Sequence, residues 1–129
     1  YEISCSLVGS EMCIRDRISS GESMIDVATE LKKRKANRIF VVATFGLFTN
    51  GLERFDKAVA DGTIYKVVTT NLTYQTPELL AKPYYINCDM SKYIAYIIDT
   101  LNHDSSISDL LNPYDRIQRL VAKYKAEQN

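Results

Sequence analysis

The sequence has no excess of charge of either sign, because its 16 lysines and arginines are matched by 16 aspartates and glutamates. Sequence-independent binding to nucleic acid needs a surplus of cations, so we expect no nucleic-acid partner. The chain also lacks a run of about 18 apolar residues, the minimum for a membrane-spanning helix. Residues 1–17 mix apolar and charged side chains and do not have the layout of a signal peptide. We therefore expect no membrane partner.

Cysteine is sparse, and its three positions form no recognisable pattern. Cys5, Cys13 and Cys88 contain no C-x-x-C pair, and the single histidine stands at no metal-ligand spacing from them. An odd, scattered set of thiols is typical of a reducing, cytosolic environment. We therefore expect unpaired cysteines, no metal site in this chain and a cytoplasmic location.

From Ile18 onward the sequence alternates helix-like and strand-like segments. Met24, Ala28 and Leu31 recur at the spacing of one helix face. Residues 38–44 form a short apolar run rich in β-branched side chains, as expected of a strand covered on both faces. The patterns predict helices over residues 22–36, 51–62, 90–104 and 112–128, and strands over residues 38–44, 64–71 and 84–89.

Strands that alternate with helices predict an α/β fold with a parallel sheet. In such folds ligands bind beyond the carboxyl ends of the strands. The loops that follow the strand positions are residues 18–23, 45–51 and 71–77. These three loops are therefore the expected rim of a ligand site.

The first of these loops, "ISSGESM", has the properties of an anion site. Gly21 lets successive backbone N–H groups turn toward one point, and Ser19, Ser20 and Ser23 add hydroxyl donors. The helix that follows directs its positive end to the same place, which suits a phosphate monoester. The same letters also suit an ordinary helix start, with Ser20 or Gly21 as the cap. Beside a phosphate, Glu22 must turn its carboxylate away.

A longer run that includes this loop, "ISSGESMIDVATELKKRKANRIFVVATFGLFTNGLERFDKA", closely resembles the C-terminal half of ribose-phosphate pyrophosphokinases, the phosphoribosyl-pyrophosphate synthetases. So do "VVTTNLTYQTPELL", "DMSKYIAYIIDTLNH" and "SSISDLLNPYDRI". The resemblance runs from Ile18 to about Lys125 and implies a truncated C-terminal half of a type I phosphoribosyltransferase-like fold. It also implies a homo-oligomeric enzyme that transfers diphosphate from ATP to ribose 5-phosphate with Mg²⁺, making phosphoribosyl pyrophosphate.

The resemblance assigns the 5-phosphate of the sugar to the backbone amides of residues 21–23 and to two serine hydroxyls. Most family members have an aspartate where this chain has Ser19. Just before the loop the family has two adjacent aspartates that contact the ribose hydroxyls and the metal, where this chain has Arg15 and Asp16. Arg15 places a cation where the family has an anion, so we expect no metal site there. The family's catalytic residues lie upstream of the matching region, so we expect no catalytic residue in this chain. The expected ribose 5-phosphate site is Ser19, Ser20, Gly21, Glu22 and Ser23, with Asp16 beside it.

The family also binds a regulatory anion between subunits, and the corresponding segment here is "SSIS", residues 105–108. Ser106 and Ser108 are the candidate residues for such a site. The same serines also fit a simpler role, as a cap for the segment "DLLN" that follows them. Both interpretations stay open at this point.

Residues 1–17 depart from the family. An apolar strand should precede the loop, but "SEMCIRDR" carries four charges in eight residues. The segment "YEISCSLVGSEMCIRDR" instead resembles a translated sequencing adapter, which matches Leu7 to Arg17 in order. We therefore expect a non-native segment over 1–17, an incomplete domain over 18–129, and the loss of the strand before the loop. That loss would open an edge of the sheet, unless residues 7–14 substitute as a poor strand.

The resemblance thus predicts one part of a ribose-phosphate diphosphokinase that binds ribose 5-phosphate. The family's metal ligands, ATP site and basic catalytic loop lie upstream of the matching region. ATP would then bind through the missing N-terminal half, and this chain would be inactive alone. Two alternatives stay open: a phosphoribosyltransferase that uses phosphoribosyl pyrophosphate at the same loop, and a non-catalytic regulatory subunit of the same fold.

Overall fold

The structure, a computed structural model, describes residues 10–104, 106–108 and 112–127. It divides into two units, one ending at Met90 and one beginning at Ser91, which we call the sheet unit and the helical unit. The sheet unit contains β1 (Ser10–Ile18), α1 (Glu22–Lys33), β2 (Arg38–Gly46), α2 (Glu53–Ala60), β3 (Lys66–Thr70), α3 (Pro77–Leu80) and β4 (Tyr85–Cys88).

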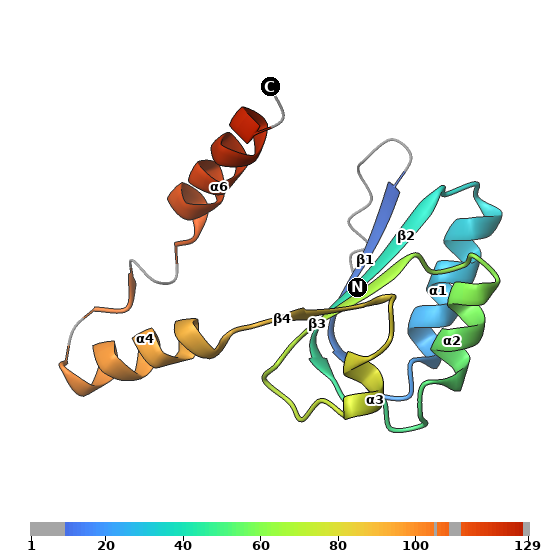
Figure 1. The fold of residues 1–129 in the computed structure, drawn as a ribbon, viewed down its shortest axis with the longest axis horizontal. Helices are drawn as coiled ribbons and strands as arrows, with labels where there is room; N and C mark the ends of the chain where they lie inside the picture. The colour runs from blue at the N-terminus through green and yellow to red at the C-terminus, as the bar shows by residue number, and fades with distance from the viewer. Residues whose placement is uncertain (1–9, 105, 109–111, 128–129) are drawn as a thin grey trace. The chain divides into compact units, whose positions relative to one another are not determined.

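The four strands form one parallel sheet in the order β1-β2-β3-β4 (Figure 1). One register row passes through Ile14, Val42, Val68 and Ile86, one residue from each strand. Helices connect β1 to β2 and β2 to β3, as a parallel sheet requires. The predicted parallel α/β fold is therefore confirmed.

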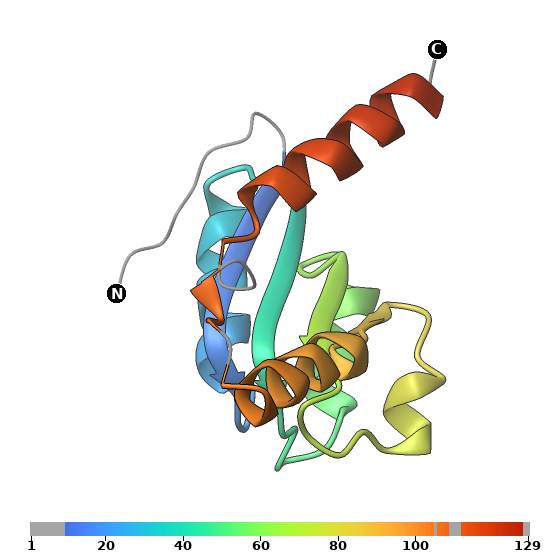
Figure 2. The ribbon, with the colours of Figure 1, turned by 90° about the vertical axis from the view of Figure 1, so that its left-hand side faces the viewer.

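β1 lies where we expected the family's strand to be lost unless residues 7–14 substituted for it, and the structure bears out that open alternative for residues 10–14. It pairs with β2 from Ser10↔Arg38 to Ile18↔Gly46, and the two strands run side by side in Figure 2. The four charges do not prevent this, because backbone pairing with β2 needs no particular side chain and two apolar residues, Cys13 and Ile18, are buried. The strand continues to Ile18, four residues beyond that alternative, whose residues 7–9 lie outside the described residues.

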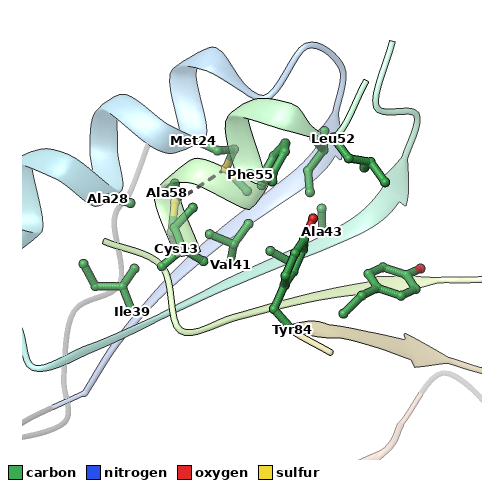
Figure 3. Close-up of a cluster of buried hydrophobic side chains, with 14 of the residues drawn as sticks. Cys13, Met24, Ala28, Ile39, Val41, Ala43, Leu52, Phe55, Ala58 and Tyr84 are labelled. Carbon is green, nitrogen blue, oxygen red and sulfur yellow. Dashed lines mark hydrogen bonds between the residues drawn. The ribbon is translucent and has the colours of Figure 1, made fainter. Parts of the chain in front are cut away.

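Helices α1 and α2 cover one face of the sheet (Figure 1). Ile39, Val41 and Ala43 of β2 are buried beneath them, and their neighbours β1 and β3 add Cys13 and Val67. Figure 3 shows Met24 and Ala28 of α1 and Phe55 and Ala58 of α2 pointing down onto these strands, with Cys13 Sγ 3.7 Å from Met24 Sδ. The helix face predicted for α1 is thus the buried one.

The other face of the sheet corrects our expectation for residues 38–44. Burial alternates along β2, so Phe40 and Val42 are only half-buried while Ile39, Val41 and Ala43 are buried. We expected cover on both faces because the run is apolar almost throughout. In the sheet unit α1 and α2 pack against one face only.

Element ends differ from the prediction where the local backbone turns. α1 stops at Lys33 instead of residue 36, because Lys35 adopts a positive φ of 69° and the Ala36 N–H bonds back to Leu31 O. β2 continues to Gly46, two residues beyond the predicted end. The expected turn at Pro77 contains the short helix α3, which Thr76 caps through its side chain.

The helical unit contains α4 (Ser91–Asn102) and α6 (Tyr114–Glu127). Asn112 caps the last helix as predicted, with its Oδ1 accepting the Tyr114 N–H at 3.2 Å. Among the described residues of this unit, neither helix buries a side chain. No helix in the part of the chain that the structure describes is long and apolar enough to cross a membrane.

Candidate functional site

The three predicted rim loops lie together at the carboxyl edge of the sheet. The Leu47 N–H donates to Ile18 O at 2.8 Å and the Thr49 N–H to Ser19 O at 3.0 Å, which joins the first loop to the second. Thr73 Oγ1 donates to Gly46 O at 3.2 Å and joins the third loop to the second. The first loop is therefore held from one side by backbone hydrogen bonds.

Gly21 turns the chain from β1 into α1. It has φ 82° and ψ −6°, the left-handed conformation that glycine adopts without strain, and it is the N-cap of the helix. No side chain caps this end, so the alternative of Ser20 as the cap was wrong. The first N–H groups of a helix have no acceptor within it. At this end they and the helix dipole are available to an anion.

The loop is also supported from below by Phe55, the largest fully buried side chain of the core. A Cβ atom placed on Gly21 would lie 2.3 Å from Phe55 Cε2. Phe55 in turn packs edge-on against Phe48 of the second loop, with ring centroids 5.2 Å apart. Glycine is therefore needed at position 21 for two reasons: it adopts the positive φ of the turn, and it lets the loop backbone lie against Phe55 of α2.

A hollow of about 260 Å³ opens at the loop, lined by residues 15–21 together with Ser23 and Met24. Ser19 and Ser23 are exposed and Ser20 is half-buried, so the three hydroxyls border solvent. Arg15 and Arg17 bring two cations to the same hollow. Its size, its donors and its positive side chains suit a small anion such as a phosphate monoester.

Asp16 lines this hollow between the two arginines, as the sequence placed it. Its Oδ1 accepts the Arg17 backbone N–H at 2.8 Å. Among the described residues no three His, Cys, Asp or Glu side chains lie close enough together to hold a metal ion. One exposed carboxylate in a hollow that two arginines also line does not fit the oxygen-rich set that Mg²⁺ prefers. The residues present therefore do not make a magnesium site.

Glu22 is the one predicted site residue whose side chain leaves the hollow. It lines a different groove, of about 270 Å³, between α1 and α2. Its Oε1 accepts a hydrogen bond from Arg54 Nη1 at 2.5 Å. The carboxylate thus turns away from the loop, as a phosphate at the loop would require.

Ser106 and Ser108 lie in the helical unit, where their hydroxyl oxygens are 2.8 Å apart. Ser106 Oγ also accepts the Ser108 N–H at 3.3 Å, a local turn of the kind that often precedes a helix. Residues 105 and 109–111, which complete both predicted roles, lie outside the described residues. The regulatory anion site stays a prediction.

Two residues that shape the loop, Arg54 and Phe55, were not predicted from the sequence. Both belong to the first turn of α2, more than 30 positions after the loop, so no local pattern connects them to it. One feature of the sequence does point to a residue such as Arg54. Glu22 puts a negative charge in a loop that should accept an anion, so a cation is needed to offset it. No comparable signal pointed to Phe55.

Comparison with known families gives one match over most of the chain. Residues 7–112 match the model of the phosphoribosyl synthetase-associated domain. This match begins at residue 7, upstream of Ile18 and inside the segment that we expected to be non-native. The origin of residues 1–17 stays a prediction.

Curated relatives point the same way. The chain is 38% identical over 63 residues to "Ribose-phosphate pyrophosphokinase" of Pyrococcus abyssi, which covers 48% of this chain and 22% of that protein. It is 26% identical over 103 residues to the protein of the same name from Mycoplasmopsis pulmonis, covering 78% and 30%. It is 31% identical over 97 residues to "Phosphoribosyl pyrophosphate synthase-associated protein 2" of Xenopus tropicalis, covering 75% and 26%.

The alignments thus span less than a third of these relatives' length. The family match covers residues 7–112, which include all four strands, the loop and α4. The chain belongs to the phosphoribosyl synthetase-associated domain family, the family of the ribose-phosphate pyrophosphokinases.

Proposed function

We propose that this chain is the part of a ribose-phosphate diphosphokinase that binds the 5-phosphate of ribose 5-phosphate. The loop between β1 and α1 carries the proposal, because it combines a left-handed Gly21, the N-terminus of α1 and a hollow lined by serines and arginines. The amides of residues 21–23 and the hydroxyls of Ser20 and Ser23 donate to the phosphate oxygens. Ser19 and Asp16 lie toward the sugar.

In the whole enzyme the transferred group is the diphosphate of ATP, and the product is phosphoribosyl pyrophosphate. Such transfer depends on positioning and on cations that screen the phosphates, which Mg²⁺ supplies when bound. The family resemblance places the ATP site and the metal ligands upstream of the matching region, so we assign ATP and the metal to the N-terminal half. This chain holds the 5-phosphate of ribose 5-phosphate in place and thereby orients the 1-hydroxyl of the same sugar toward the diphosphate. We further propose a cytoplasmic, homo-oligomeric parent enzyme.

The binding step is tested by titrating the ¹⁵N-labelled chain with ribose 5-phosphate up to millimolar concentration. We expect the amide signals of residues 20–24 to shift, and ribose without phosphate to leave them in place. Loop amides that do not move with ribose 5-phosphate would contradict the proposal.

We propose that residues 1–129 alone are inactive, because the alignments span less than a third of the relatives' length and the resemblance places the ATP site outside the matching region. An assay of residues 1–129 with ATP, ribose 5-phosphate and Mg²⁺ should give no phosphoribosyl pyrophosphate. Turnover in that assay would overturn this part of the proposal and leave the binding step standing.

A second candidate, a non-catalytic regulatory subunit, is favoured by the relative named as a synthase-associated protein. The upstream coding sequence distinguishes the two functions. A catalytic-loop Lys and Arg in an intact reading frame would favour the synthetase, and their replacement would favour the regulatory subunit.

A further inference from the structure

The proposed phosphate loop contains one acidic residue, Glu22, and a cation from another helix holds it. Glu22 is the first residue of α1, and Arg54 lies in the first turn of α2. Arg54 Nη1 donates to Glu22 Oε1 at 2.5 Å, across 32 positions of sequence. The ion pair therefore joins the amino-terminal ends of two helices.

This pair lies to one side of the proposed phosphate position. Glu22 and Arg54 both line the groove between α1 and α2, and neither lines the hollow at the loop. Both side chains are about half exposed, at 51% and 56%. The carboxylate is thus kept in the groove by an exposed partner and not by burial, so it can rotate once the partner is gone.

Arg54 also has a second, indirect connection to the loop. Its neighbour Phe55 lies directly beneath Gly21, so consecutive residues of α2 touch consecutive residues of the loop. Phe55 fixes the backbone of the loop, and Arg54 fixes its one negative side chain. The first turn of α2 acts as the support of the whole loop.

We propose that Arg54 is a positioning residue for the phosphate site, which holds the Glu22 carboxylate in the groove and offsets its charge so that a phosphate monoester can bind the loop. The inference rests on the proposed function, since it assumes an anion at residues 20–23. Arg54 does not touch the phosphate. Its effect comes from repulsion that Glu22 would otherwise exert on a dianion, and such repulsion is significant within about 10 Å at low salt.

The test is a four-protein cycle in the full chain: wild type, Arg54→Met, Glu22→Gln and the double variant. Ribose 5-phosphate affinity is measured from the loop amide shifts at low ionic strength. Arg54→Met should weaken binding by about five-fold, the effect of one unscreened carboxylate near a dianion. Glu22→Gln alone should leave affinity unchanged or tighten it, because it removes an anion and leaves the Arg54 cation, and in the Arg54→Met background it should restore binding. Inorganic phosphate should show the same coupling.

Arg34→Met is the matched control, because Arg34 pairs with Glu30 at the opposite end of α1 and carries the same charge. It should leave affinity unchanged. If Arg54→Met binds as well as wild type, or if Glu22→Gln fails to rescue it, the inference is overturned while the proposed function stands. If the wild-type chain itself shows no binding, both are overturned.

Discussion

The two faces of the sheet have similar apolar side chains in different surroundings. On the face beneath α1 and α2, Ile39, Val41 and Val67 are almost fully buried. On the other face, one register row across all four strands keeps Ile14 60% and Ile86 45% exposed. Valine stands in both environments, buried at position 41 and half-buried at position 42.

The difference shows that an apolar strand sequence does not by itself tell which faces of the strand are buried. It shows only that the strand would tolerate burial on both faces. The sequence of β2 suits cover on both faces, which is typical of parallel sheets. In the sheet unit α1 and α2 supply that cover on one face. Stability should therefore depend on which face a side chain points to, even between neighbours in one strand.

Phe55→Ala should be the most damaging single change on the covered face. Phe55 is fully buried, packs against Phe48 and lies under Gly21. Removing a buried aromatic ring typically costs about 3–5 kcal/mol. Urea unfolding followed by circular dichroism measures the loss, and Tyr74→Ala, at an 81% exposed aromatic residue, is the control with a change under about 0.5 kcal/mol. A loss below about 1 kcal/mol for Phe55→Ala would contradict the covered face as the source of stability.

Gly21→Ala tests how the buried side chain of Phe55 supports the loop between β1 and α1. The positive φ alone costs about 1 kcal/mol or more for alanine, and the new methyl group would also collide with Phe55. We expect a total loss of about 2–3 kcal/mol and weaker ribose 5-phosphate binding. Gly62→Ala is the matched control, because its φ of 72° is similar but no atom lies within 4 Å of the new Cβ. Equal losses in the two variants would show that the contact with Phe55 is unimportant.

Much of the fold follows from local patterns. The helical face of α1, the β-branched run of β2 and the cap at Asn112 each depend on residues close in sequence, and the structure confirms them. The rim of three loops follows from parallel topology alone, because the carboxyl ends of parallel strands meet at one edge.

The rest depends on contacts that the sequence does not display. A strand before the loop was left open because the charges of β1 argued against it, whereas pairing with β2 and the burial of Cys13 and Ile18 decide the outcome. The supports of the loop were missed because Arg54 and Phe55 lie far from it along the chain. Local rules predict elements well, but a site held by tertiary contacts needs the structure.

Val41→Ala and Val42→Ala test the two faces most directly, because they remove the same two methyl groups from adjacent positions of β2. Any loss of strand propensity is shared and cancels in the comparison. Val41→Ala should cost about 2 kcal/mol through the cavity that it leaves. Val42→Ala should cost less than about 1 kcal/mol because its side chain is already partly hydrated. Equal losses by urea unfolding would mean that the second face is covered as well as the first.

The smallest expected effect concerns an ion pair that ties α2 to the start of β4. Asp56 accepts hydrogen bonds from Lys82 Nζ at 2.7 Å and Tyr84 Oη at 2.8 Å. The hydrogen bond from Lys82 and then that from Tyr84 lower the pKa of Asp56, against an opposing effect of burial. A lowered pKa means that the folded state favours the carboxylate. This stabilisation is therefore present above the ordinary carboxyl range and is lost as pH falls through the folded pKa.

Asp56→Asn should therefore be less stable than wild type at pH 7, and the difference should shrink as the pH falls below about 4. Urea unfolding midpoints measured from pH 7 to pH 2.5 give this difference directly. Tyr84→Phe should keep most of the acid-side dependence, because Lys82 is the larger cause of the shift. On the alkaline side burial and then Asp56 raise the pKa of Tyr84, so its contribution should fade above about pH 10 and be absent in Tyr84→Phe. A difference between wild type and Asp56→Asn that stays constant down to pH 2.5 would show that the charge of Asp56 does not stabilise the attachment of α2 to the sheet.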